Sequence, residues 1–261
     1  MCLAVLALAA HPDFPLILCS NRDEFFERPA LPIHFWKDQP EIFGGIDLKA
    51  NGTWLACTRE GRLAFLTNVR NLKKPPHPNP RSRGLLVSEF LMDKGSLEDY
   101  ANQVLERSGE YEGFNLLLYE RGRTIYLGND PKSKMEVEPG IHAVSNASWN
   151  TDWPKTTRAK RAVEEQILTG NFGKEEFFKI FADATREDDP DKLPDTGIGK
   201  EKERILSSIR IQTPGYGTRG TTITWISKNQ LTMVERIYPD PMVDLYSERT
   251  LVCPMEPNWS V

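Results

Sequence analysis

The chain has 261 residues, of which 39% are hydrophobic and 27% are charged, a balance typical of a globular protein with a sizeable core. Its formal net charge of −4 argues against general nucleic-acid binding, which requires a basic face that displaces counterions from phosphates. No shift in composition marks a domain boundary, so a single domain over residues 1–261 is predicted.

The first predicted element is a β-hairpin with strands at residues 2–10 and 15–20. The apolar run Leu3 to Ala10 is similar to the core of a signal peptide, but no Lys or Arg precedes it and His11-Pro12-Asp13 interrupts it. A second apolar run follows at once, as expected for a returning strand. We therefore expect no export signal, and no stretch is long enough to span a membrane.

Four polar residues, Asn21-Arg22-Asp23-Glu24, follow the second strand. If the two strands pair, this segment lies beside Cys2 at the start of the first strand. Arg22 would then stabilise a thiolate, and Asp23 would hold an amine. From these residues alone, a solvated charged turn is at least as good an interpretation.

The middle of the chain alternates between loops, hairpins and helices. Residues 25–41 contain three prolines and are predicted to be a loop. Ser96 is a plausible helix N-cap, with Asp99 three residues on. In chain order we predict a hairpin at 53–58 and 63–68, an exposed loop at 70–83, helices at 84–93 and 96–108, a hairpin at 114–119 and 124–127, and a strand at 141–145.

The last third has a similar alternation. Helices are predicted at 155–168 and 174–184, a mobile polar loop at 186–201, and strands at 221–226 and 231–237. Hairpins and helices thus come in separate groups. This grouping predicts an α+β fold with antiparallel sheets rather than a doubly wound parallel sheet.

The cysteines and histidines are scattered along the chain. No C-x-x-C pair or H-E-x-x-H helix is present, so we expect neither a disulfide framework nor a metal site. Reduced thiols in the cytoplasm fit this pattern. The residues are Cys2, Cys19, Cys57 and Cys253, with His11, His34, His77 and His142.

Cys2 follows the initiator Met1, and methionine is normally trimmed when the second residue is as small as Cys. Trimming would leave an α-amine with a reference pKa of about 8 beside a thiol with a reference pKa of about 8.5. Such an amine can accept the thiol proton, directly or through one water, which activates the nucleophile. Two alternatives remain: Met1 is retained and blocks the amine, or Cys2 is a small apolar residue that opens a buried strand.

Several segments together resemble the NRDE family, the family of the transport and Golgi organisation 2 protein. The match runs from residue 2 to about residue 237, and the ordered set is more specific than any one motif. Its members are Met1-Cys2, Asn21-Arg22-Asp23-Glu24 with Arg28-Pro29, Gly44-Gly45-x-Asp47, Asn51-Gly52-Thr53-Trp54, Thr67-Asn68, Ser145-Asn146-Ala147, Trp153-Pro154-Lys155 and Thr218-Arg219-Gly220-Thr221.

The resemblance implies a four-layer αββα sandwich of the N-terminal nucleophile hydrolase type. Penicillin V acylase and bile salt hydrolase share that fold and begin with Cys. By position, Arg22 and Asp23 would flank the Cys2 thiol and Arg219 would help to set the site. Asn146 would be the first candidate for the oxyanion contact, with Asn68 as the second candidate.

The spacing of Arg22 and Asp23 differs from that in the acylases, so the residue that faces the thiol is not determined. In the acylases the Arg and the Asp are separated in sequence, whereas Arg22 and Asp23 are adjacent. Neighbours on an extended chain point in opposite directions, so either Asp23 or Glu24 could face the thiol.

The predicted activity is hydrolysis of an amide or thioester of a small acyl or lipid-like substrate through an acyl-Cys2 intermediate, with no cofactor. The alternative is a non-catalytic carrier of haem, acyl-CoA or lipid, as members of the family are linked to haem trafficking and acyl-CoA metabolism. His11, His34 and His142 are possible haem ligands, although none lies in a haem motif. The sequence does not predict an oligomeric state.

Two other signals are set aside. Gly215-x-Gly217-x-x-Gly220 matches a dinucleotide fingerprint literally, but a strand rather than a helix is predicted after it. The basic residues Lys73, Lys74, Arg81 and Arg83 are interpreted as a solvated loop. If they bind anything, the phosphate of an acyl-CoA or a membrane surface is the better candidate.

Overall fold

The first strand shows how the layers arise. Residues 3–8 are continuously apolar, and successive side chains of a strand point to opposite faces. Leu3, Val5 and Ala7 pack against helices, whereas Ala4, Leu6 and Leu8 pack against a second sheet. A strand buried on both faces therefore lies in the interior of the sandwich.

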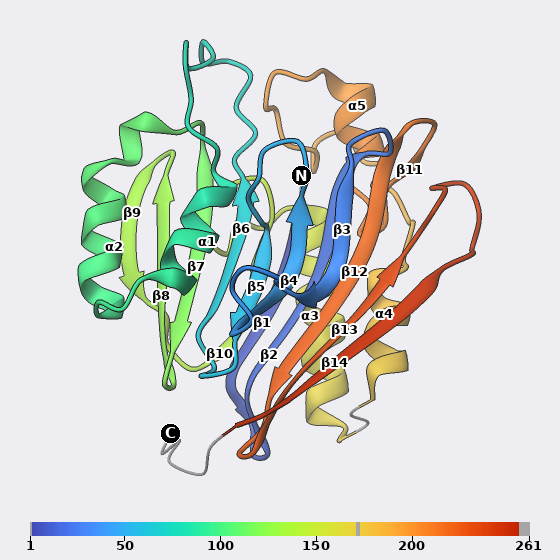
Figure 1. Cartoon of the computed structure of the whole chain (residues 1–261). Coiled ribbons are helices and arrows are strands. Elements are labelled where there is room, and N and C mark those ends of the chain that lie inside the picture. Colours follow the sequence, from blue (N-terminus) through green and yellow to red (C-terminus); the bar gives the residue numbers. More distant parts are fainter. Residues whose placement is uncertain (1, 171–172, 256–261) are drawn as a thin grey trace.

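The computed structural model describes residues 2–170 and 173–255, which form two seven-stranded antiparallel sheets with helices on their outer faces (Figure 1). The first sheet has the order β10-β1-β2-β12-β13-β14, and β11 pairs with β12. Its strands are β1 (Cys2–His11), β2 (Phe14–Phe25), β10 (Gly140–Val144), β11 (Gln212–Thr213), β12 (Tyr216–Ile226), β13 (Gln230–Ile237) and β14 (Ser247–Pro254).

The second sheet is a meander in chain order from β3 to β9. Sequential neighbours pair throughout, but β6 and β7 are joined by the long segment 69–113, which contains α1 (Gly84–Met92) and α2 (Leu97–Glu106). Its strands are β3 (Ala30–Phe35), β4 (Ile42–Asp47), β5 (Leu55–Thr58), β6 (Leu63–Asn68), β7 (Phe114–Glu120), β8 (Arg123–Asn129) and β9 (Lys132–Glu136).

Helices cover the outer face of each sheet. On the second sheet, α1 and α2 form one apolar cluster with the strands beneath them. On the first sheet, α3 and α4 form another (Figure 1). The helices are α1 (Gly84–Met92), α2 (Leu97–Glu106), α3 (Pro154–Leu168), α4 (Lys174–Phe181) and α5 (Lys200–Ile205), with a short 3-10 turn, η1 (Ser108–Glu110).

These layers confirm the predicted four-layer αββα sandwich of antiparallel sheets. The three predicted hairpins form, and Ser96 caps α2 by accepting a hydrogen bond from the Asp99 backbone N–H at 3.0 Å. The glycine-rich segment 215–220 runs into β12, so the strand predicted after this motif is confirmed. Within residues 2–170 and 173–255, no helix is long and apolar enough to cross a membrane.

Some assignments are wrong or incomplete. The predicted loop at 25–41 contains β3, which accommodates Pro32 because the register of this edge strand shifts between Leu31 and His34. The Asn21–Glu24 segment lies within β2 rather than after it, because β12 pairs with it. Strands β4, β9 and β14 were not predicted. Helix α5 begins inside the predicted loop at 186–201.

Candidate active site

Cys2 is the first residue of β1 and lies directly opposite Arg22 of β2. Directly opposed residues of an antiparallel pair project on the same face, here the face between the two sheets. Both residues line a cavity of about 370 Å³, together with Asn68 from the second sheet. The thiol is therefore placed at a hollow between the sheets, although only 7% of Cys2 is exposed.

The groups around the Cys2 thiol shift its pKa in opposite directions. Burial raises the pKa of Cys2, and the Asp23 carboxylate raises it further. The Arg22 guanidinium and a hydrogen bond from the Asp23 backbone N–H lower this pKa in part. Because the net shift is upward, the thiol is protonated at neutral pH, and attack on a carbonyl carbon requires a proton acceptor.

Arg22 is held in place by Asp47 and Trp54, which belong to two later motifs of the sequence. Its guanidinium stacks on the Trp54 ring at 4.2 Å from the centroid, and its Nη2 lies 3.9 Å from Asp47 Oδ2. Stacking and charge together fix a side chain that is only 9% exposed. This explains why segments around Asp47 and Trp54 belong to the same motif set as Arg22.

Of the two adjacent carboxylates, Asp23 is the buried one. It is 1% exposed, and its Oδ1 accepts a hydrogen bond from Thr218 Oγ1 at 2.7 Å. Burial raises its pKa. Glu24 is half-buried, with its Oε2 3.9 Å from Arg28 Nε. Both line the Cys2 cavity, but the backbone N–H that contacts the thiol belongs to Asp23.

Lys155 interacts with the Asp23 carboxylate and was not predicted to be a site residue. It is 1% exposed, and burial lowers its pKa to about 8, an effect that the Asp23 carboxylate partly opposes. A buried lysine needs such a counter-charge. The sequence contained two signals for it: Lys155 belongs to the Trp153-Pro154-Lys155 motif, and it stands in the first turn of α3, where a cation opposes the helix dipole.

The two asparagines have different surroundings. Asn146 is completely buried, and its Nδ2 donates to the Asn68 backbone carbonyl at 2.9 Å. Its Oδ1 accepts from Ser145 Oγ at 3.2 Å and lies 3.5 Å from Lys155 Nζ. This amide is occupied and does not line the cavity, whereas Asn68 does. The geometry therefore favours Asn68 as the amide that reaches a ligand.

Arg219, like Asn146, is a predicted site residue that does not line the cavity. It stands at a register shift in β12, and its Nη1 donates to the Arg28 carbonyl. It lines a separate small hollow with Arg22 and Glu235 instead. Extended pairing of β12 with β2 gives Thr218, not Arg219, the position against Asp23.

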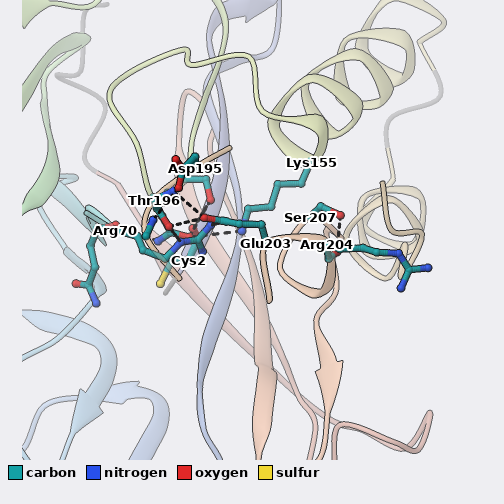
Figure 2. A network of polar contacts seen from close by, with 12 residues as sticks. Cys2, Arg70, Lys155, Asp195, Thr196, Glu203, Arg204 and Ser207 are labelled. Atoms are coloured by element: carbon teal, nitrogen blue, oxygen red, sulfur yellow. Dashed lines mark hydrogen bonds and ion pairs between the residues drawn. The ribbon is translucent and has the colours of Figure 1, made fainter. Parts of the chain in front are cut away.

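A second buried network adjoins Lys155 (Figure 2). Arg70 Nη2 lies 2.6 Å from Glu203 Oε2, and Glu203 Oε1 accepts from Thr196 Oγ1 at 2.6 Å. Figure 2 shows this network gathered between Cys2 and the end of the Lys155 side chain. It joins the segment after β6 to α5, so part of the predicted mobile loop at 186–201 is held by buried contacts.

In the parts of the chain that the structure describes, no group of three or more His, Cys, Asp or Glu side chains is arranged to hold a metal ion. The three possible haem ligands are also absent from the residues that line the Cys2 cavity. His34 contacts the Pro32 carbonyl, and His142 stacks on Trp149.

Comparison with known proteins gives one family and a set of relatives. The family model described as "Transport and Golgi organisation 2" matches residues 1–240. The transport and Golgi organization protein 2 homolog of Bos taurus is 34% identical over 240 residues, covering 85% of this chain and 86% of the relative. The homolog of Homo sapiens is 32% identical over 258 residues, covering 91% of each chain.

Among solved structures, the conjugated bile acid hydrolase of Clostridium perfringens is similar over 100% of this chain and 98% of its own, with 10% identity and a TM-score of 0.49. The N-acylethanolamine-hydrolyzing acid amidase ortholog of Caenorhabditis elegans covers 85% of this chain and 91% of its own, with 8% identity and a TM-score of 0.42. At these TM-scores neither likeness carries an argument about activity.

Proposed function

The chain belongs to the transport and Golgi organisation 2 family, and we propose that it is a cysteine hydrolase of the N-terminal nucleophile type that cleaves an amide or thioester of a small acyl substrate. The observation that carries this proposal is the position of Cys2. It begins an interior strand, and its thiol lines a cavity together with Arg22 and Asn68. Removal of Met1 would give the same residue a free amine.

In the proposed reaction, the amine of the trimmed chain takes the proton from Cys2 Sγ while the sulfur bonds to the acyl carbon. This proton transfer is needed because the thiol pKa is raised by burial. The Asn68 amide donates to the oxyanion that develops on the carbonyl oxygen. The carbon–nitrogen or carbon–sulfur bond of the substrate then breaks, and the ammonium returns its proton to the leaving group.

Deacylation completes the cycle. A water molecule attacks the acyl-Cys2 carbon as the amine takes one of its protons. The sulfur–carbon bond breaks, the acid is released, and the thiol regains a proton. Asp23 and Lys155 act from behind the nucleophile in this scheme: Asp23 holds the amine, and Lys155 neutralises the buried Asp23 carboxylate.

The lining of the cavity gives less support to a carrier of haem or lipid. Eight of the eighteen described residues that line it are charged, among them Arg22, Asp23 and Asp47. A carrier of an apolar ligand requires a mainly apolar cavity. A small polar acyl compound matches this lining better, and the four free cysteines support the proposed cytoplasmic location.

Intact-mass measurement and an acyl probe test the proposal. The purified protein should lack Met1. p-Nitrophenyl acetate should acylate Cys2, and peptide mapping should find the acetyl group there rather than on Cys19, Cys57 or Cys253, which are 0% exposed. Cys2→Ser is the matched loss-of-thiol variant, and Cys19→Ala is the control that should retain acylation.

Retention of Met1, or acylation spread equally over the four cysteines, would contradict the proposal. A Soret shift on titration with micromolar haem, with Cys2 unreactive, would favour the carrier instead.

A further inference from the structure

Four arginines line the Cys2 cavity, and three of them have carboxylate partners. Arg28 Nε lies 2.7 Å from Asp47 Oδ2, and Arg22 Nη2 lies 3.9 Å from the same oxygen. Arg81 binds Glu89 and Glu110, each at 3.0 Å. The charges of these three side chains are thus balanced within the protein.

The fourth, Arg83, has no such partner. Among the described residues, no carboxylate oxygen lies within 4.0 Å of its guanidinium, and Nη1 donates to the neutral Gly113 carbonyl at 2.8 Å. Arg83 is half-buried, and burial lowers its pKa. Glu112 lines the same cavity, but its Oε1 already accepts a hydrogen bond from the His77 backbone N–H at 2.8 Å.

A guanidinium has five N–H donors in a planar fork that matches a carboxylate or a phosphate. A partly desolvated cation usually has a charged partner in the folded protein. Arg83 has most of its donors unused, and it shares its cavity with the candidate nucleophile. The missing partner is therefore expected to be part of a ligand.

The position of Arg83 also indicates how a ligand would lie. It precedes α1 and lines a neighbouring hollow of about 810 Å³ as well as the Cys2 cavity. Asn68 and Glu112 line both hollows too, so the two hollows adjoin at these residues. Arg83 therefore lies at the border between the Cys2 cavity and the second hollow, where it can meet one end of a ligand whose other end lies at Cys2.

We propose that Arg83 binds an oxyanionic group, a carboxylate or a phosphate, of a substrate whose reactive carbonyl lies at Cys2. This inference rests on the proposed function and adds the substrate class: acyl compounds that carry a negative charge near the scissile bond.

Two alkylating reagents of nearly equal size test this directly. Iodoacetate and iodoacetamide both form a bond from Cys2 Sγ to carbon with loss of iodide, and the thiol proton goes to solvent; the reagents differ in charge. The measured quantity is the ratio of their alkylation rates at Cys2, followed by peptide mass spectrometry. Arg83→Met should lower the iodoacetate-to-iodoacetamide ratio about tenfold, because a charge-assisted hydrogen bond is lost.

Arg81→Met is the matched control, because Arg81 lines the same cavity but has two carboxylate partners. Its rate ratio should stay within about twofold of the wild type. An Arg83→Met protein with an unchanged ratio would overturn the inference while leaving the hydrolase proposal intact.

A second measurement does not require a reactive thiol. A bound anion stabilises the folded state, so phosphate or acetate should raise the Tm of the wild type relative to chloride at equal ionic strength. The rise should be absent in Arg83→Met and retained in Arg81→Met. Which anion acts distinguishes a phosphate site from a carboxylate site. No rise with either anion would overturn the inference even if Cys2 proves inert.

Discussion

At the scale of single residues, the site depends on which polar side chains are already occupied. Asn146 and Asn68 are equivalent as chemical groups, but the Asn146 amide is bonded on both sides. Asn68 contributes its backbone carbonyl to that contact. In the described chain, the Asn68 side chain lines the cavity without a hydrogen-bond partner of its own. An unoccupied donor can respond to charge that develops in a transition state, whereas an occupied donor cannot.

Replacement of Asn68 by Ala should therefore slow acylation of Cys2 by p-nitrophenyl acetate by about 10²–10³-fold, the usual cost of one oxyanion donor. The measurement is release of p-nitrophenol by enzyme whose Met1 removal has been verified by mass. Asn71→Ala is a nearby control, because Asn71 contacts Asp130 outside the Cys2 cavity. An Asn68→Ala rate equal to that of the wild type would remove this residue from the proposed oxyanion site.

Lys155 and Asp23 show why buried charges have to be considered in pairs. Burial shifts the pKa of each toward its neutral form, and the opposite charge of the partner opposes both shifts. Both side chains are 1% exposed, so the pair places charge near Cys2 without contact to solvent.

At the scale of elements, β3 is one of the strands that the sequence did not predict. Its register breaks between Leu31 and His34, so the Ile33 N–H has no strand partner in that interval. Glu235 of β13 accepts that hydrogen bond at 2.8 Å through Oε2. A side chain from the first sheet thus completes the backbone bonding of the second sheet.

The burial of the Glu235 carboxyl makes stability depend on pH, and the hydrogen bond from the Ile33 N–H partly opposes the shift of its pKa. Burial raises the pKa of Glu235 from 4.5 to about 7. The folded state holds the proton more tightly than the unfolded state, so the stabilisation is present below about pH 4.5 and is lost as pH rises through about 7. For this one group the loss is up to about 3 kcal/mol.

Glu235→Gln should remove that dependence, because the amide still offers an oxygen to the Ile33 N–H but does not ionise. The measurement is the free energy of unfolding in urea at pH 5 and pH 8. The decrease from pH 5 to pH 8 should be smaller in the variant by about 2–3 kcal/mol. Equal pH dependence in the two proteins would show that Glu235 does not titrate in this range.

At the scale of the whole molecule, buried pairs connect segments that are distant in sequence. Arg70 follows β6 of the second sheet, and Glu203 belongs to α5, which leads to the first sheet. The loops that precede α1 and α5 rise from the same end of the molecule as the start of β1 (Figure 1). The Arg70–Glu203 contact therefore closes the end of the sandwich at which Cys2 lies.

Glu203→Gln should destabilise the protein by about 3–5 kcal/mol, because it leaves a buried guanidinium without its counter-charge. Urea unfolding measures this. Asp195→Asn is a matched control, because the Lys73–Asp195 pair joins the same two segments at 2.7 Å but is exposed to solvent. The control should cause no measurable change, and equal effects of the two substitutions would contradict the assignment of stability to burial.

The sequence by itself determined the hairpins, most of the helices and the juxtaposition of Cys2 with Arg22. These features follow from local periodicity and from the pairing of two strands joined by a short turn. The irregular edge strand β3 and the late strand β14 escaped prediction, because prolines obscured the first and a polar run obscured the second.

Only the tertiary structure decided which polar side chains lie next to one another. Strand β12 pairs with β2 across about two hundred residues of sequence, and this pairing turns Thr218 toward Asp23 and leaves Arg219 elsewhere. The burial of Lys155, the occupied Asn146 amide and the unpaired charge of Arg83 are likewise set by long-range packing. Spacing along a chain fixes the face on which a side chain lies, but its partners depend on how distant strands and helices assemble.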